Sequence, residues 1–157
     1  MKHTLSILLL LAVLINGTSC ARKESSHPVT GDYMVIGMAG GFVAYPVLTY
    51  YLINNGQLKM DSTVPYGAIP TDINKFNFNI QCSADKYQLV SDLLNNIPSE
   101  LLGMDNQSIG NVFPDAGFTD VRASVNGTVY RWRFQADLSG TTSTIQQFVT
   151  HARLVFQ

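Results

Sequence analysis

Two Asn-Gly dipeptides constrain the fold of this chain more than any other feature of its sequence. Asn55-Gly56 and Asn126-Gly127 each stand between runs that are rich in β-branched and aromatic residues. Asn-Gly favours a two-residue type I′ turn, because both central positions of that turn need a positive φ, and such turns join adjacent antiparallel strands. The sequence therefore predicts two β-hairpins centred on these dipeptides.

Counting outward from the second turn predicts the residues that face each other across that hairpin. Three couples form an apolar face, which we expect to be the core face: Ala123 with Tyr130, Val121 with Trp132, and Thr119 with Phe134. The other face pairs Asp120 with Arg133 and sets Arg122 opposite Arg131. This like-charged pair is tolerable only where solvent or an acidic partner screens it.

The same reasoning predicts the remaining strands. In the first hairpin, Ile53 is expected to face Leu58, and Tyr51 to face Met60. Residues 33–38 read as an earlier strand and residues 76–80 as a short one.

Two segments carry the apolar spacing of amphipathic helices. The first runs from Ala84 to Leu94, and the second follows an S-x-x-Q capping box at Ser143 and Gln146. The buried stripe predicted for the second helix is Ile145, Phe148, Val149, Ala152 and Val155. We therefore expect an α+β fold, in which an antiparallel sheet of about four to six strands is built from hairpins and both helices pack on one face.

The N-terminus has the features of a removable leader. A positive start is followed by an apolar run from Leu5 to Ile15, interrupted only by Ser6, and small residues then precede Cys20. At 1.5 Å per residue this run spans about 16 Å, roughly half the hydrocarbon core of a bilayer, which disfavours a permanent transmembrane helix.

The boundary at Cys20 resembles a bacterial lipobox. The resemblance implies that residues 1–19 are a lipoprotein signal peptide, that Cys20 carries acyl chains, and that the protein is held in the bacterial cell envelope at the outer membrane, on either its periplasmic or its outer face. Residues 20–30 then form a flexible tether, and residues 31–157 form a single domain. An ordinary secretory leader, with Cys20 present by chance, is the alternative.

Composition and cysteine content exclude several classes of protein. A net charge of -1 with 13% charged residues lacks the cationic excess that nucleic-acid binding needs. Once Cys20 is acylated, Cys82 is the one remaining thiol, so an intramolecular disulfide is excluded. We expect Cys82 to be a small buried apolar residue, and a thiol activated at a helix start is the alternative.

Few residues suggest chemistry. His27, His151 and one thiol are too few and too far apart in the sequence for a zinc site, and a G-x-S-x-G elbow is missing. Asp105, Asp115 and Asp120 could converge into a catalytic pair, but solvated loop acids are the favoured interpretation. The sequence therefore predicts no catalytic residue, no metal and no cofactor.

The segment Gly40-Gly41-Phe42 with Tyr45 is the most unusual in composition. Paired glycines free the backbone, and the two aromatic residues offer contact area at low entropic cost. One interpretation is a glycine-kinked hairpin whose rings fold into the core, and the other is a protruding contact loop. We take Gly40, Gly41, Phe42 and Tyr45 as candidate binding residues.

Several stretches resemble known families. Residues 33–38, 93–102 and 114–116, with the Tyr130-x-Trp132-x-Phe134 strand, resemble a family of small Bacteroidota lipoproteins over most of residues 33–157. This implies an envelope location and one domain but no particular activity. Gly40-Gly41-Phe42 is also similar to the opening of emfourin-like protease inhibitors.

These observations together predict a membrane-anchored, non-enzymatic binding module. Its partner would be a protein, and inhibition of a protease is one form that such binding could take. The alternative is a small hydrolase or ligand-binding enzyme whose site assembles only in the fold. A concave pocket with converging polar side chains would favour the alternative, whereas a flat or protruding aromatic surface would favour protein contact.

Overall fold

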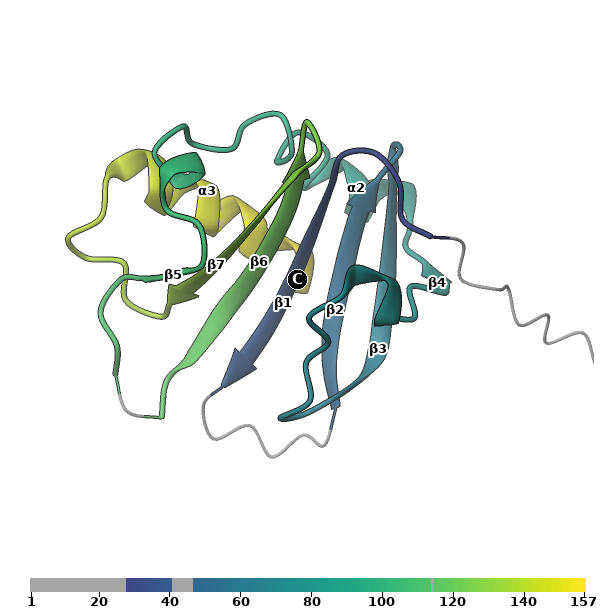
Figure 1. Ribbon diagram of the computed structural model, residues 1–157, viewed down its shortest axis with the longest axis horizontal. Helices are drawn as coiled ribbons and strands as arrows, with labels where there is room; N and C mark the ends of the chain where they lie inside the picture. Colours follow the sequence, from purple (N-terminus) through teal and green to yellow (C-terminus); the bar gives the residue numbers. More distant parts are fainter. Residues whose placement is uncertain (1–27, 41–46, 114) are drawn as a thin grey trace, which may run out of the picture.

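In the computed structural model, which describes residues 28–40, 47–113 and 115–157, the strands form one mixed sheet (Figure 1). The seven strands stand in the order β4-β3-β2-β1-β6-β7-β5. Their bounds are β1 Tyr33–Gly40, β2 Val47–Asn54, β3 Gln57–Pro65, β4 Ile80–Gln81, β5 Gln107–Ile109, β6 Gly117–Val125 and β7 Thr128–Gln135. All neighbours are antiparallel except β5 and β7, which are parallel.

Both predicted hairpins and their registers are confirmed. Asn55 and Asn126 have φ values of 50° and 51°, as a type I′ turn requires. Across β6 and β7, Val121 faces Trp132, and the other couples follow the predicted count. The β2–β3 hairpin also keeps its predicted register until a bulge between Leu48 and Tyr50.

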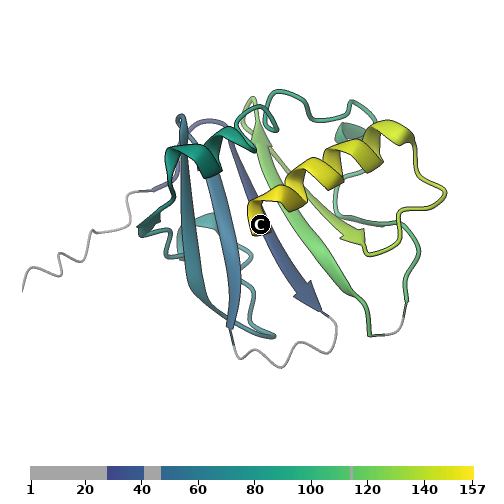
Figure 2. The same cartoon turned by 180° about the vertical axis from the view of Figure 1, so that it is seen from behind.

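The first core lies between the sheet and α3 (Ser143–Arg153), which crosses one face of the sheet (Figure 2). The predicted apolar stripe of this helix is buried along its whole length. Trp132 is fully buried in this core, and its Nε1–H donates to the carbonyl oxygen of Leu101 at 2.9 Å. The core face predicted from strand alternation is therefore confirmed.

The helices differ from the prediction in their bounds. The middle helix, α2, spans only Ala84–Gln88, because the chain continues beyond it in successive turns that bury Val90 and Leu93. The N-cap of α3 is Thr142, one residue before the predicted Ser143, and its hydroxyl accepts from the N–H of Ile145. The described residues also contain three short 3-10 helices: η2 Ile73–Lys75, η3 Leu101–Gly103 and η4 Leu154–Phe156. Across the part of the chain that the structure describes, no helix has the length and apolar character needed to cross a membrane.

The strand predicted at residues 76–80 is wrong except for its last residue. Here the ladder contains only Ile80–Gln81, which is β4. The Phe76 side chain instead packs against the face of the sheet opposite α3, where it is 3% exposed. Phe78 stacks on it with ring centroids 5.2 Å apart. Burial of the two rings thus replaces strand pairing in this stretch.

A second core lies on the face opposite α3. It includes Tyr33, Val35, Ala39, Leu48, Tyr50, Leu52, Val64 and Phe76. Residues 66–79, which we call the covering segment, pass in front of β2 and β3 on this face (Figure 1) and pack into the core that these strands share with β1. Both faces of this half of the sheet are therefore buried.

Candidate functional site

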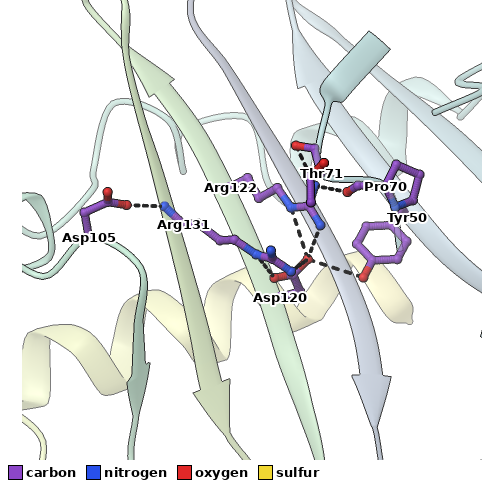
Figure 3. A network of polar contacts seen from close by, with 7 residues as sticks. All are labelled: Tyr50, Pro70, Thr71, Asp105, Asp120, Arg122 and Arg131. Atoms are coloured by element: carbon purple, nitrogen blue, oxygen red, sulfur yellow. Dashed lines mark hydrogen bonds and ion pairs between the residues drawn. The ribbon is translucent and has the colours of Figure 1, made fainter. Parts of the chain in front are cut away.

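The most strongly connected polar group in the described structure is Asp120, which is fully buried in β6 on the face opposite α3. Its carboxylate accepts hydrogen bonds from Nε and Nη2 of Arg122 at 3.2 and 2.9 Å, and from Nε of Arg131 at 3.0 Å. The hydroxyl of Tyr50 donates to the same carboxylate at 3.3 Å. Figure 3 shows these three side chains converging on Asp120.

Arg122 extends this network to the covering segment. Its Nη1 donates to the carbonyl oxygens of Pro70 and Thr71, and its guanidinium lies 5.3 Å from the centre of the Phe76 ring. Every nitrogen of this buried guanidinium therefore has a partner. The network holds the covering segment against the sheet.

The interpretation of Asp120 as a solvated loop acid is wrong, because the residue lies in a strand beneath two arginines. It is also the acidic partner that allows Arg122 to face Arg131. Asp105 accepts from the backbone N–H of Arg131, and Asp115 is exposed with a φ of 67°. The structure therefore does not bring the three acids together as a catalytic pair.

Tyr50 has a chemical state that follows from this environment. Burial raises the pKa of its hydroxyl well above the usual value, and the nearby charge of Asp120 raises it further. The phenol therefore stays protonated and donates to Asp120. Because both arginines and Tyr50 bond to Asp120 inside the fold, the network has a structural role rather than the features of a reactive site.

A groove lies at the other end of the covering segment. It encloses about 350 Å³, and its walls are residues 28–30, the β2–β3 hairpin and residues 73–79. Six of its fourteen lining residues carry carboxamides: Asn54, Asn55, Gln57, Asn74, Asn77 and Asn79. We call this feature the amide groove.

Two of the carboxamides hold the walls of the groove together. The Nδ2 atom of Asn54 donates to the carbonyl oxygens of Thr30 and Asp32 at 3.1 and 2.9 Å. The Oδ1 atom of Asn74 accepts from the N–H of Val29 at 3.2 Å. The entry of the chain into the domain is therefore fixed beside the groove.

The other four carboxamides have no side-chain hydrogen bond to any residue that the structure describes. They are Asn55, Gln57, Asn77 and Asn79, and all four are exposed. The backbone N–H of Asn77 donates to Asp61 at 2.7 Å, and Asp61 is itself buried in β3. A buried carboxylate thus positions one wall while the amide of that wall stays open to solvent.

Besides its carboxamides, the groove is lined by one partly exposed aromatic ring, Phe78, and one charged side chain, Lys59. Phe78 is half-buried, and its ring lies within 15° of parallel to that of Phe76. Lys59 is the one ionisable side chain among the lining residues, none of which is Asp, Glu, His or Cys.

The binding loop predicted at Gly40 to Tyr45 lies largely outside the described residues. Gly40 ends β1 with a φ of 78°, and an added Cβ would meet the Phe118 ring at 3.0 Å. Gly41, Phe42 and Tyr45 are outside the described ranges, as is Cys20. The amide groove lies near the opposite end of β1, so the structure does not bring these two candidate regions together.

Neither of the other reactive side chains forms a site. Cys82 is partly buried, and burial raises the pKa of its thiol, against a smaller lowering by Lys86. An activated thiolate at this helix start is therefore disfavoured. The Nε2 atom of His151 lies 2.6 Å from the carbonyl oxygen of Leu89 and 3.5 Å from the carboxylate of Asp92.

Among residues 28–40, 47–113 and 115–157, no three His, Cys, Asp or Glu side chains gather as metal ligands would. Comparison of the chain with protein-family models, curated proteins and solved structures finds no match. The resemblances noted from the sequence therefore stay predictions.

Proposed function

We propose that this protein is a lipid-anchored binding module of the bacterial cell envelope, and that it binds its ligand in the amide groove without catalysing a reaction. The observation that carries this proposal is the set of four solvent-facing carboxamides around one concave site. Hydrogen-bond donors and acceptors that converge on a groove without partners in the protein are typical of a ligand-binding site. The leader and Cys20 support the anchoring part of the proposal.

The lining of the groove favours binding over catalysis. General acid–base catalysis and covalent catalysis both need a titratable or nucleophilic side chain with a partner that tunes it. Carboxamides do not ionise near neutral pH and so cannot serve as general acids or bases, and Lys59 has no carboxylate or imidazole beside it among the lining residues. The concave shape fits the ligand-binding part of the alternative prediction, but the groove lacks the residues of a hydrolase.

Isotope-edited NMR of the protein purified from membranes in detergent tests the site. Fractions of a native envelope extract are added, and the signals of side-chain carboxamides are followed. We expect shifts at Gln57, Asn77 and Asn79, with no change at Gln88 and Asn95, which are exposed amides away from the groove. Shifts confined to other surfaces, or no shift with any fraction, would reject the groove as the binding site.

A separate measurement tests the anchor. Mass spectrometry of the mature N-terminus should find acyl chains on Cys20, and Cys20→Ser should abolish them. An unmodified N-terminus at another residue would contradict the anchoring proposal while leaving the groove unaffected.

A further inference from the structure

Resting on the proposed function, the geometry of the amide groove points to a neutral, hydroxyl-rich ligand, and we infer that the groove takes a short stretch of an uncharged saccharide chain. Three observations support this ligand class: the chemistry of the free side chains, the presentation of Phe78, and the construction of the floor.

The free side chains match hydroxyl groups. A carboxamide offers two N–H donors and a carbonyl acceptor, and a hydroxyl group is also both donor and acceptor. Gln57, Asn77 and Asn79 can therefore pair with neighbouring hydroxyls whichever way the hydroxyl hydrogens point. An anionic ligand would find a single cation in Lys59, and a cationic ligand would find no carboxylate in the lining.

Phe78 supplies a flat apolar surface in the same groove. Its ring stacks on that of Phe76 with a centroid distance of 5.2 Å, and Phe76 is buried against the sheet. The orientation of Phe78 is thus fixed before a ligand arrives, which lowers the entropic cost of binding. A sugar ring presents C–H groups on its face and hydroxyls at its rim, so it can contact Phe78 and the carboxamides at once.

The floor of the groove disfavours an extended peptide. Leu52, Asn54 and Lys59 line it with side chains, and the backbones of β2 and β3 beneath are already paired with each other. A peptide that binds by strand addition gains much of its affinity from main-chain hydrogen bonds to a sheet edge, and the floor offers no such row. The volume of about 350 Å³ is at the lower end of the range for ligand sites, which fits a short segment of a chain.

An array of glycans tests this inference with the detergent-purified protein. Neutral glucan, mannan and galactan oligosaccharides are printed beside uronic-acid and sulfated ones, and a capped alanine peptide serves as the peptide probe. We expect binding to neutral glycans only. The affinity for the best of them is then measured by calorimetry.

Single substitutions localise the binding. Gln57→Ala, Asn77→Ala and Asn79→Ala should each weaken it by roughly 2- to 13-fold, the worth of one hydrogen bond. The matched changes Gln88→Ala and Asn95→Ala should leave it unchanged. Thermal unfolding of each variant checks that the fold is retained.

Phe78→Leu separates the flat ring from mere apolar bulk, because leucine keeps the apolar contact with Phe76 without the flat surface. We expect weaker binding of the neutral glycan, with thermal unfolding again reporting whether the fold is retained. Unchanged affinity in a folded Phe78→Leu variant would contradict the stacking role.

The outcomes distinguish failure of the ligand class from failure of the site. If the peptide or an acidic glycan shifts the groove carboxamides in NMR and neutral glycans do not, the groove binds but the ligand class is wrong. If neutral glycans bind and all three amide variants keep full affinity, the site itself is wrong. If no neutral glycan binds, the inference is overturned.

Discussion

Replacing Asp120 by asparagine should destabilise the domain far more than its modest change in shape suggests. The substitution removes the one negative charge between Arg122 and Arg131, and Arg122 is only 5% exposed. Breaking a buried ion pair from one side typically costs about 3 to 5 kcal/mol, out of about 5 to 15 kcal/mol for a whole domain. For a chain of this size that corresponds to a fall in Tm of roughly 6 to 20 °C.

The assay is denaturant unfolding followed by tryptophan fluorescence, since Trp132 is the one tryptophan and is fully buried. Asp115→Asn is the matched control, because Asp115 is exposed and asparagine tolerates its positive φ. The double variant Asp120→Asn with Arg122→Met should lose less stability than the sum of the single changes, because the uncompensated buried charge is gone. Equal stabilities for Asp120→Asn and Asp115→Asn would refute the reasoning.

Three further predictions follow from the described contacts. Gly37→Ala should cost about 1 to 3 kcal/mol in unfolding free energy, because its Cβ would overlap the Tyr50 ring, whereas Gly103→Ala, which meets no neighbour within 4 Å, should cost less than about 0.5 kcal/mol. Because the folded-state pKa of Tyr50 is raised, its stabilising effect is complete below the unfolded value of about 10 and is lost as pH rises above it. Between about pH 9 and 11 the free energy of unfolding should therefore fall by up to about 1.4 kcal/mol per pH unit, and it should fall less steeply in Tyr50→Phe. An identical slope in the two proteins would contradict this. In a Cys20→Ser background, iodoacetamide should alkylate Cys82 more slowly in the folded protein than in the unfolded one near neutral pH, since burial raises the pKa of the thiol, and equal rates would show that the thiol is freely accessible.

The hairpins were predictable because their information is local. An Asn-Gly turn fixes the phase of two strands, and alternation then assigns each residue to a face, so the burial of Trp132 followed from counting. The parallel pairing of β5 with β7 had no such signal. Only Gln107–Ile109 takes part, and it meets a strand about 25 residues away with no turn to set the register.

The polar face was harder to predict because polarity in an alternating strand usually means exposure. Asp120 occupies a position that alternation assigns to solvent, yet the covering segment and two arginines bury it. Residues 66–75, the first part of the covering segment, have neither helical nor strand periodicity, so no local pattern predicted a layer there.

The amide groove was not predictable either, because contacts between residues far apart in the sequence build it. Asp61 fixes Asn77, and Asn54 fixes the entry of the chain at Thr30, over separations that no local pattern encodes. One signal was present in the sequence. Asn77 and Asn79 alternate with Phe76 and Phe78, so amides and rings are interleaved within one short stretch of the sequence.

The construction of β3 also bears on how copies of this protein behave when they are crowded together. Only Lys59 and Met60 pair with β4, so within the described residues the outer edge of β3 from Asp61 to Pro65 has no neighbouring strand. In this stretch the Asp61 carboxylate accepts a hydrogen bond from the N–H of Thr63, and a bulge interrupts the pairing of β3 with β2. Pro65 has no N–H to donate. Such features block the addition of a foreign strand, and the sheet is therefore protected against edge-to-edge aggregation on this side.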